Sequence, residues 1–353
     1  MAEVALRTYI EQIESMIDSG QVDEAIAHVR HILEKYPKYV DAYRVLGKAF
    51  IEKGRHQDAA DIFQRVLSVE PDDFVSHVGM SIVREDESNL DGAIWHMERA
   101  YEEQPANAAI QDELKRLYER RDGLEPPRIR LTRGALARMY MKGHLHPQSV
   151  AELRAALAED ADRQDLRALL ARALWDDQQR VEAAEVSNEI LEDLPYCRTA
   201  NRILSVAWSE GGNDEQARIY RSRLAALDPY EAHSTNGDVV FGAGQVAADS
   251  VKLTRLEYRP GVDEFSDDER PDWMQALGAE FDAPGTESDT PDWLRESAEA
   301  VASEPSTAPT ATGDLPDWLQ EAGAAVPAEA AAPAVTSADD GDDVPDWLEA
   351  ELG

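Results

Sequence analysis

The sequence predicts an all-α fold, with about seven stacked helix pairs over residues 1–230 and a largely disordered tail after them. The first observation is a pattern of apolar and small residues at helical spacing, which recurs along the first two-thirds of the chain. The second is a proline that closes successive blocks at intervals of 34 residues: Pro37, Pro71 and Pro105, and later Pro195 and Pro229. The third is a change of composition, because residues 231–353 hold 29 acidic and 5 basic residues, a net charge of −24.

Residues 40–71 show the repeating unit most clearly. Their apolar residues fall in two blocks that Gly54 separates and Pro71 ends: Tyr43, Leu46 and Phe50, then Ala59, Phe63 and Val66. Two helices joined by a tight turn satisfy this pattern. Gly47 and Ala59 would lie where the helices cross, since only small side chains let two backbones approach closely.

This pattern resembles the tetratricopeptide repeat, whose units of 34 residues place small, aromatic and proline residues at these offsets. The resemblance implies a right-handed superhelix whose inner groove binds proteins, because each unit buries its apolar face only by stacking on neighbours. We expect four units in 1–123, a break over 124–130, and three units in 131–230. A capping or linker segment over 231–262 and the tail over 263–353 would follow.

The family lines its groove with the first helix of each unit, and this implies a set of candidate binding residues. At the fifth and ninth positions of those helices the sequence has Arg44, Lys48, Arg116, Arg138, Arg172 and Arg202. A positive stripe in a concave groove would attract an acidic peptide, since guanidinium groups fork onto carboxylates. The alternative is that these are ordinary helix charges paired with nearby Asp and Glu.

The tail repeats a different motif, which has the form Pro-Asp-Trp-Leu or Pro-Asp-Trp-Met. Its four copies occupy 271–274, 291–294, 316–319 and 345–348. Proline and aspartate favour a helix start, and the apolar pairs would be binding anchors. These pairs are Trp273 and Met274, Trp293 and Leu294, Trp318 and Leu319, and Trp347 and Leu348. Four copies imply multivalent binding, unless they arose by duplication without a partner.

The motif also resembles the tryptophan-acidic cargo peptides that the tetratricopeptide domain of kinesin light chains binds. That resemblance implies that the groove of this chain could bind its own tail, within one molecule or between two.

Composition excludes several classes of partner and location. The whole chain has a net charge of −36, which argues against binding nucleic acid or an anionic membrane surface. No run of apolar residues is long enough to span a bilayer, and the first residues lack the features of a secretory signal. The single cysteine, Cys197, permits no internal disulfide and fits a small core residue. We therefore expect a cytoplasmic protein.

Catalytic and cofactor motifs are nearly absent. Gly242, Gly244 and Ala247 match part of a dinucleotide-binding pattern, but no further βαβ unit follows. His144 and His146 alone are too few for a zinc site. We predict a non-enzymatic scaffold or adaptor with protein partners, no cofactor and no metal. The alternative is an accessory regulatory subunit that tethers an enzyme or a secretion or assembly complex.

Overall fold

The computed structural model describes residues 3–123, 128–233 and 246–260, and almost all of them are helical. The elements, in chain order, are β1 (Glu3–Ala5), α1 (Leu6–Asp18), α2 (Val22–Lys35), α3 (Val40–Glu52), α4 (His56–Val69), α5 (Phe74–Asp86), α6 (Leu90–Glu103), α7 (Ala108–Asp122), α8 (Arg133–Lys142), α9 (His146–Glu159), α10 (Gln164–Asp176), α11 (Arg180–Asp193), α12 (Arg198–Glu210), α13 (Asp214–Leu227), the 3-10 helices η1 (Pro229–His233) and η2 (Ala248–Ser250), and β2 (Lys252–Thr254). The prediction of an all-α array is confirmed.

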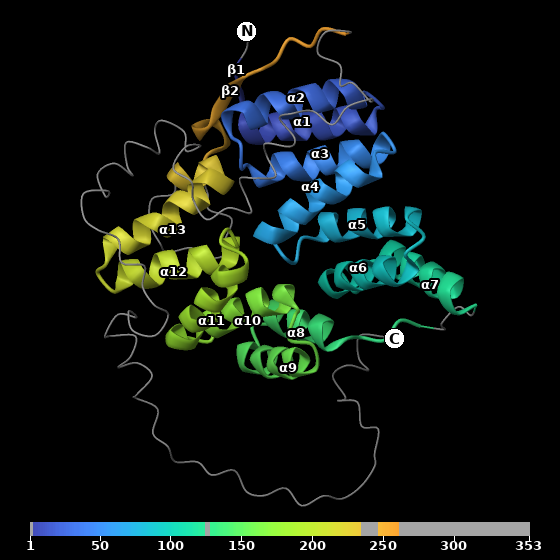
Figure 1. Cartoon of the computed structure of the whole chain (residues 1–353). Coiled ribbons are helices and arrows are strands. Elements are labelled where there is room, and N and C mark those ends of the chain that lie inside the picture. The colour runs from blue at the N-terminus through green and yellow to red at the C-terminus, as the bar shows by residue number, and fades with distance from the viewer. Residues whose placement is uncertain (1–2, 124–127, 234–245, 261–353) are drawn as a thin grey trace, which may run out of the picture.

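Successive helices pack in pairs, and each pair packs on the next (Figure 1). The tight turn inside each pair contains one residue in the left-handed conformation. These residues are Gly20, Gly54, Ser88, His144, Gln178 and Gly212. Within each half of the array they are 34 residues apart, so the turn keeps the repeat length even where glycine is absent.

The fourth unit consists of a single described helix, α7. This helix ends at Gly123, which adopts a left-handed conformation with φ 75°. Pro126 and Pro127, which the sequence places in the break, lie outside the described residues. Helix α8 then packs on α6 and not along α7. The array therefore has six helix pairs and one unpaired helix among its described residues, where the sequence predicted about seven pairs.

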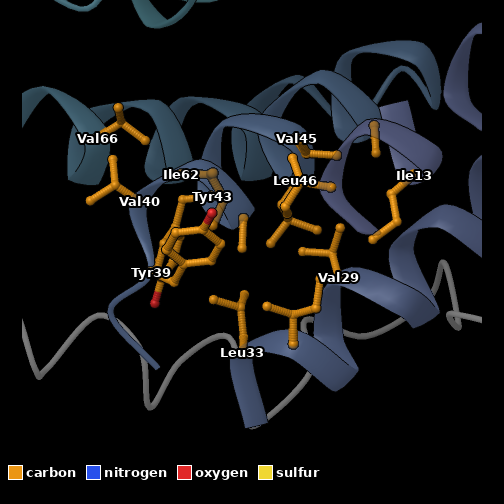
Figure 2. Packing of buried hydrophobic residues seen from close by; sticks show 14 of the residues in the cluster. Ile13, Val29, Leu33, Tyr39, Val40, Tyr43, Val45, Leu46, Ile62 and Val66 are labelled. Atoms are coloured by element: carbon orange, nitrogen blue, oxygen red, sulfur yellow. The ribbon is translucent and has the colours of Figure 1, made fainter. Parts of the chain in front are cut away.

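The core of the first two repeats shows how small and large residues interlock. Tyr39, Tyr43 and Leu46 of the second repeat lie against Val29 and Leu33 of the first (Figure 2). The same core holds Phe63, which is fully buried in α4.

Gly47 of α3 and Gly79 of α5 both face the Phe63 ring. A Cβ atom added to either glycine would come within 2.5 Å of the ring at Gly47 and 2.2 Å at Gly79. The sequence pattern correctly placed Gly47 at a helix crossing.

The two ends of the array meet, which the sequence did not predict. In Figure 1 the last elements return beside the first, and β2 pairs antiparallel with β1, with Val4 opposite Leu253. Leu227, Tyr230, Val251 and Leu253 are buried in the same core as helices α1 to α4. The array is therefore a closed ring, and each end covers the apolar face that the other end would expose.

We call the contact between the two ends the seam. It joins Arg7, Lys38 and Glu70 on one side to Tyr196, Arg198 and Tyr230 on the other.

Candidate protein-binding face

The six basic residues that the sequence proposed for the groove lie in different surroundings. Lys48, Arg116 and Arg172 keep 40%, 42% and 45% of their side chains exposed. Arg44 and Arg202 are half-buried, and Arg138 is only 4% exposed. The ring thus does not present them as one continuous stripe.

Arg44 and Arg202 belong to ion pairs near the seam. Arg44 contacts Asp41, Glu70 and Asp73, and its Nε donates to Asp73 at 2.6 Å. Glu70 also accepts from Arg198 at 2.9 Å, so one carboxylate joins the second repeat to helix α12. Arg202 pairs with Glu231 of η1.

Arg138 lies in a buried charge network between α6, α8 and the start of α10. Its Nε donates to Glu103 at 2.8 Å, and its Nη2 is 3.8 Å from Asp165. Arg163 completes the network, because it donates to Glu102 at 2.5 Å and to Asp165 at 2.7 and 2.8 Å. This network holds the two halves of the array together.

The network shifts the pKa of Asp165, the carboxylate that both Arg138 and Arg163 contact. Burial alone would raise the pKa of Asp165, but the hydrogen bonds and charge of Arg163, with the charge of Arg138, outweigh it and hold that pKa below its usual value. Asp72, nearby, has a raised pKa because burial outweighs the charge of Arg138. The contact between α6, α8 and the start of α10 is therefore a structural charge cluster.

The three exposed candidates also have carboxylate partners. Lys48 Nζ is 2.6 Å from Glu14, and Arg172 Nε is 3.8 Å from Asp176. Arg116 pairs with Glu85 and Glu113 at 2.6 and 2.5 Å. All six candidates are thus ion-paired within the chain. For Arg44, Arg138 and Arg202, which are also buried or half-buried, this favours the alternative that they are ordinary helix charges. The exposed pairs are weaker, since such pairs contribute about 0–1 kcal/mol.

One apolar residue lies among the exposed candidates. Ile82, on α5, is 39% exposed and occupies the same repeat position as Lys48 on α3 and Arg116 on α7. We call Lys48, Ile82 and Arg116 the first-helix face. The sequence analysis did not propose Ile82 as a binding residue, because the argument there rested on charge.

The tail candidates lie outside the described residues. They are Trp273, Met274, Trp293, Leu294, Trp318, Leu319, Trp347 and Leu348. Their role in binding stays a prediction.

Comparison with known proteins agrees with this architecture. The family model described as "Tetratricopeptide repeat" matches residues 16–77, which span α2, α3 and α4 and reach into α1 and α5. Over these residues the chain matches the tetratricopeptide repeat family. Arrays of this family generally serve as protein-interaction scaffolds and are typically non-catalytic. No curated protein matches the sequence.

Several solved structures are similar to this chain. One is a tetratricopeptide repeat protein from Parabacteroides merdae, at 12% identity and a TM-score of 0.30, covering 66% of this chain and 95% of that one. Another is PilF of Pseudomonas aeruginosa, at 14% identity and a TM-score of 0.27, covering 64% and 92%. A third is MamA from strain AMB-1, at 17% identity and a TM-score of 0.26, covering 53% and 96%. These scores are low, and nothing about function follows from them.

In the part of the chain that the structure describes, no group of three or more His, Cys, Asp or Glu side chains is placed to hold a metal ion. None of the described helices is long and apolar enough to cross a membrane.

Proposed function

We propose that this protein is an interaction scaffold whose first-helix face binds an acidic segment of a partner protein that also carries an apolar anchor. The observation that supports this is the exposed Ile82, at the repeat position that Lys48 and Arg116 occupy on the neighbouring first helices. An apolar side chain of the ligand would cover Ile82, and its carboxylates would reach the two cations.

The charges on this face can change partners at low cost. Glu14 and Glu85, the present partners of Lys48 and Arg116, lie on the neighbouring first helices α1 and α5. Glu85 also accepts from Arg120, so two guanidinium groups share one carboxylate. A ligand carboxylate could therefore fork onto one of these arginines without leaving a buried charge unpaired.

The tail motifs have the chemistry that this face requires. Each joins an aspartate to a tryptophan and a Leu or Met, and we propose that they are ligands, for this face or for a second protein. Four weak ligands on one chain bind together more strongly than one, because the first contact raises the local concentration of the others.

The test is the binding of a labelled peptide covering residues 286–301, followed by fluorescence anisotropy. The receptor is the full-length chain with Trp→Ala at the four tail motifs, so that its own tail does not compete. We expect Arg116→Ala and Ile82→Ala each to weaken binding by about tenfold, equivalent to about 1.4 kcal/mol. Added salt should weaken binding as well, because the charges on this face are exposed.

Arg133→Ala is the matched control, since Arg133 is an exposed arginine of α8 that pairs with Glu152 and Glu159. It should leave the affinity unchanged. No binding at millimolar peptide, or an equal loss in the control, would contradict the proposal.

A further inference from the structure

Residues 246–256, which we call the strap, lie across the first repeat after the chain has passed the last one. Strand β2 pairs with β1 over three residues, and Leu6 N–H donates to Val251 O at 2.9 Å. Val251 and Leu253 are each 4% exposed, whereas Lys252 and Arg255 between and beyond them are exposed. The strap therefore holds the first repeat with two apolar anchors and a short strand pairing.

Polar contacts fix the rest of the strap. Leu256 N–H donates to the Tyr9 hydroxyl at 3.1 Å, and that hydroxyl is 2.6 Å from His28 Nδ1. His31 Nε2 is 2.8 Å from the carbonyl oxygen of Thr254, so it must be the donor there. These partners all come from α1 and α2, which means that the strap is seated on a single helix pair.

Tyr230 connects the strap to the seam. Its hydroxyl donates to Ala248 O at 2.8 Å and accepts from Arg7 N–H at 3.2 Å. The Arg7 guanidinium lies 3.9 Å from the centre of the Tyr230 ring and donates to Val246 O at 3.3 Å. Release of the strap would remove the hydrogen bond of Arg7 to Val246 and that of Tyr230 to Ala248 at the same time.

The polar contacts of the seam are incompletely satisfied. Lys38 Nζ donates to the Tyr196 hydroxyl at 2.9 Å, and Arg198 donates to Glu70 at 2.9 Å. The Nε and Nη2 atoms of Arg198 are buried without a hydrogen-bond partner among the described residues. Buried donors without partners oppose closure, so they offset part of the stability that the buried Leu227 and Tyr230 give to the seam.

We propose that the strap is a releasable autoinhibitory element. Its release removes Val251 and Leu253 from the core that the two ends share and so weakens the seam. The opened ring then exposes Arg44 and Arg198 to the same acidic segments that the first-helix face binds. The autoinhibition proposal rests on the proposed function for the chemistry of the partner. The closed ring and its strap do not depend on that function.

The covalent connection of the strap permits release without unfolding the helices. Residues 234–245 join η1 to the strap, and a stretch of that length reaches up to about 40 Å when extended. The helix pairs below are held by their own cores, which contain many residues from both helices of each pair.

The test uses the full-length chain, with the four Trp→Ala substitutions in its tail and a specific protease site placed within 234–245. The chain folds with the strap in place, and cleavage then separates residues 246–353 from the array. We expect this fragment to leave at submicromolar concentration, and the amides of α1 to exchange faster while helix content is kept. A fragment that stays bound on dilution, or an array that unfolds when it leaves, would overturn the proposal.

Binding of the 286–301 peptide before and after cleavage tests the inhibition. We expect the cleaved form to bind at least threefold more tightly, and equal affinity in both forms would overturn autoinhibition while leaving the first-helix face intact. Absence of binding in both forms would instead contradict the proposed function and, with it, autoinhibition. Amide exchange would still show whether the strap is released. Leu253→Asp removes an anchor and should reproduce the faster exchange in the uncleaved chain, whereas Lys252→Asp, at an exposed position of the same strand, should not.

Discussion

Replacing Gly79 with alanine is expected to destabilise the array by about 2 kcal/mol, because overpacking a filled core typically costs about 1–3 kcal/mol. The new Cβ atom would lie 2.2 Å from Cε2 and 2.4 Å from Cζ of Phe63. The ring has no room to move toward α3, since a Cβ atom added at Gly47 would itself lie within 2.5 Å of it. The gain in helix propensity, at most about 1 kcal/mol for Gly→Ala, opposes this cost only in part. The measurement is urea unfolding followed by circular dichroism.

Gly143→Ala is the matched control for this prediction. A Cβ atom there has no neighbour closer than 3.5 Å, and φ at this residue is −85°. We expect its unfolding midpoint to stay close to that of the unsubstituted chain. Phe63→Leu should recover part of the loss when combined with Gly79→Ala, and a Gly79→Ala chain as stable as the control would show that Phe63 does not fill this site.

Arg163→Ala is expected to have the largest effect on stability, a loss of about 3–5 kcal/mol, because it leaves buried carboxylates without their cation. Arg163 is the shared partner of Glu102 and Asp165, which are both buried. Glu102 would keep the Thr132 hydroxyl at 2.8 Å, and Asp165 would keep Arg138 at 3.8 Å. Neither replaces the lost hydrogen bonds, so the contact between α6 and the start of α10 should weaken.

The pH dependence of this effect follows from the pKa of Asp165. That pKa is depressed in the folded chain, so the carboxylate contributes stability above its unfolded pKa of about 3.9, and this contribution is lost as the pH falls through the folded value. The gap between the unsubstituted chain and Arg163→Ala should therefore be full at neutral pH and narrow below about pH 4. Arg133→Ala, which removes exposed ion pairs with Glu152 and Glu159, should cost much less. Equal losses in the two variants would contradict a buried network.

The repeat and most helix positions could be predicted from the sequence because they depend on local spacing. Prolines at 34-residue intervals mark the boundaries between units, and Gly47 marks a helix crossing. The turns were harder to place where glycine is absent, since Ser88, His144 and Gln178 adopt the left-handed conformation with positive φ. The neighbouring helices fix that conformation, and no residue type in the sequence indicates it.

The closed ring could not be predicted, because it depends on contacts between residues more than 100 positions apart. Arg7 with Tyr230 and Leu256 with Tyr9 are examples. The strap shows only a short alternation of apolar and polar residues, which suits any strand or extended segment. The sequence could therefore predict a capping or linker segment here but not which end of the array it contacts.

The candidate groove was predicted by position, and position alone does not separate a binding charge from a structural one. Arg138 and Arg116 occupy the same place in their repeats, yet Arg138 is buried in the central network and Arg116 is exposed on α7. The difference arises because α8 packs on α6 after the single helix of the fourth unit. A shift in stacking thus changes the role of a residue without changing its repeat position.

The closure of the ring can be tested with one cross-strand disulfide. Ala5 and Lys252 face each other in the antiparallel pairing. Leu6 N–H donates to Val251 O, so the neighbouring pair, Ala5 and Lys252, is a non-hydrogen-bonded pair. The Cα atoms of such a pair are about 4.5 Å apart, which lies within the range that a disulfide spans. Ala5→Cys with Lys252→Cys in the full-length chain should form a bond within one chain on mild oxidation, as seen by mass spectrometry. Ala5→Cys with Asp214→Cys, at the end of α13 away from η1, should not. If no bond forms in the first variant, or if it forms only between two chains, the array is not a closed ring.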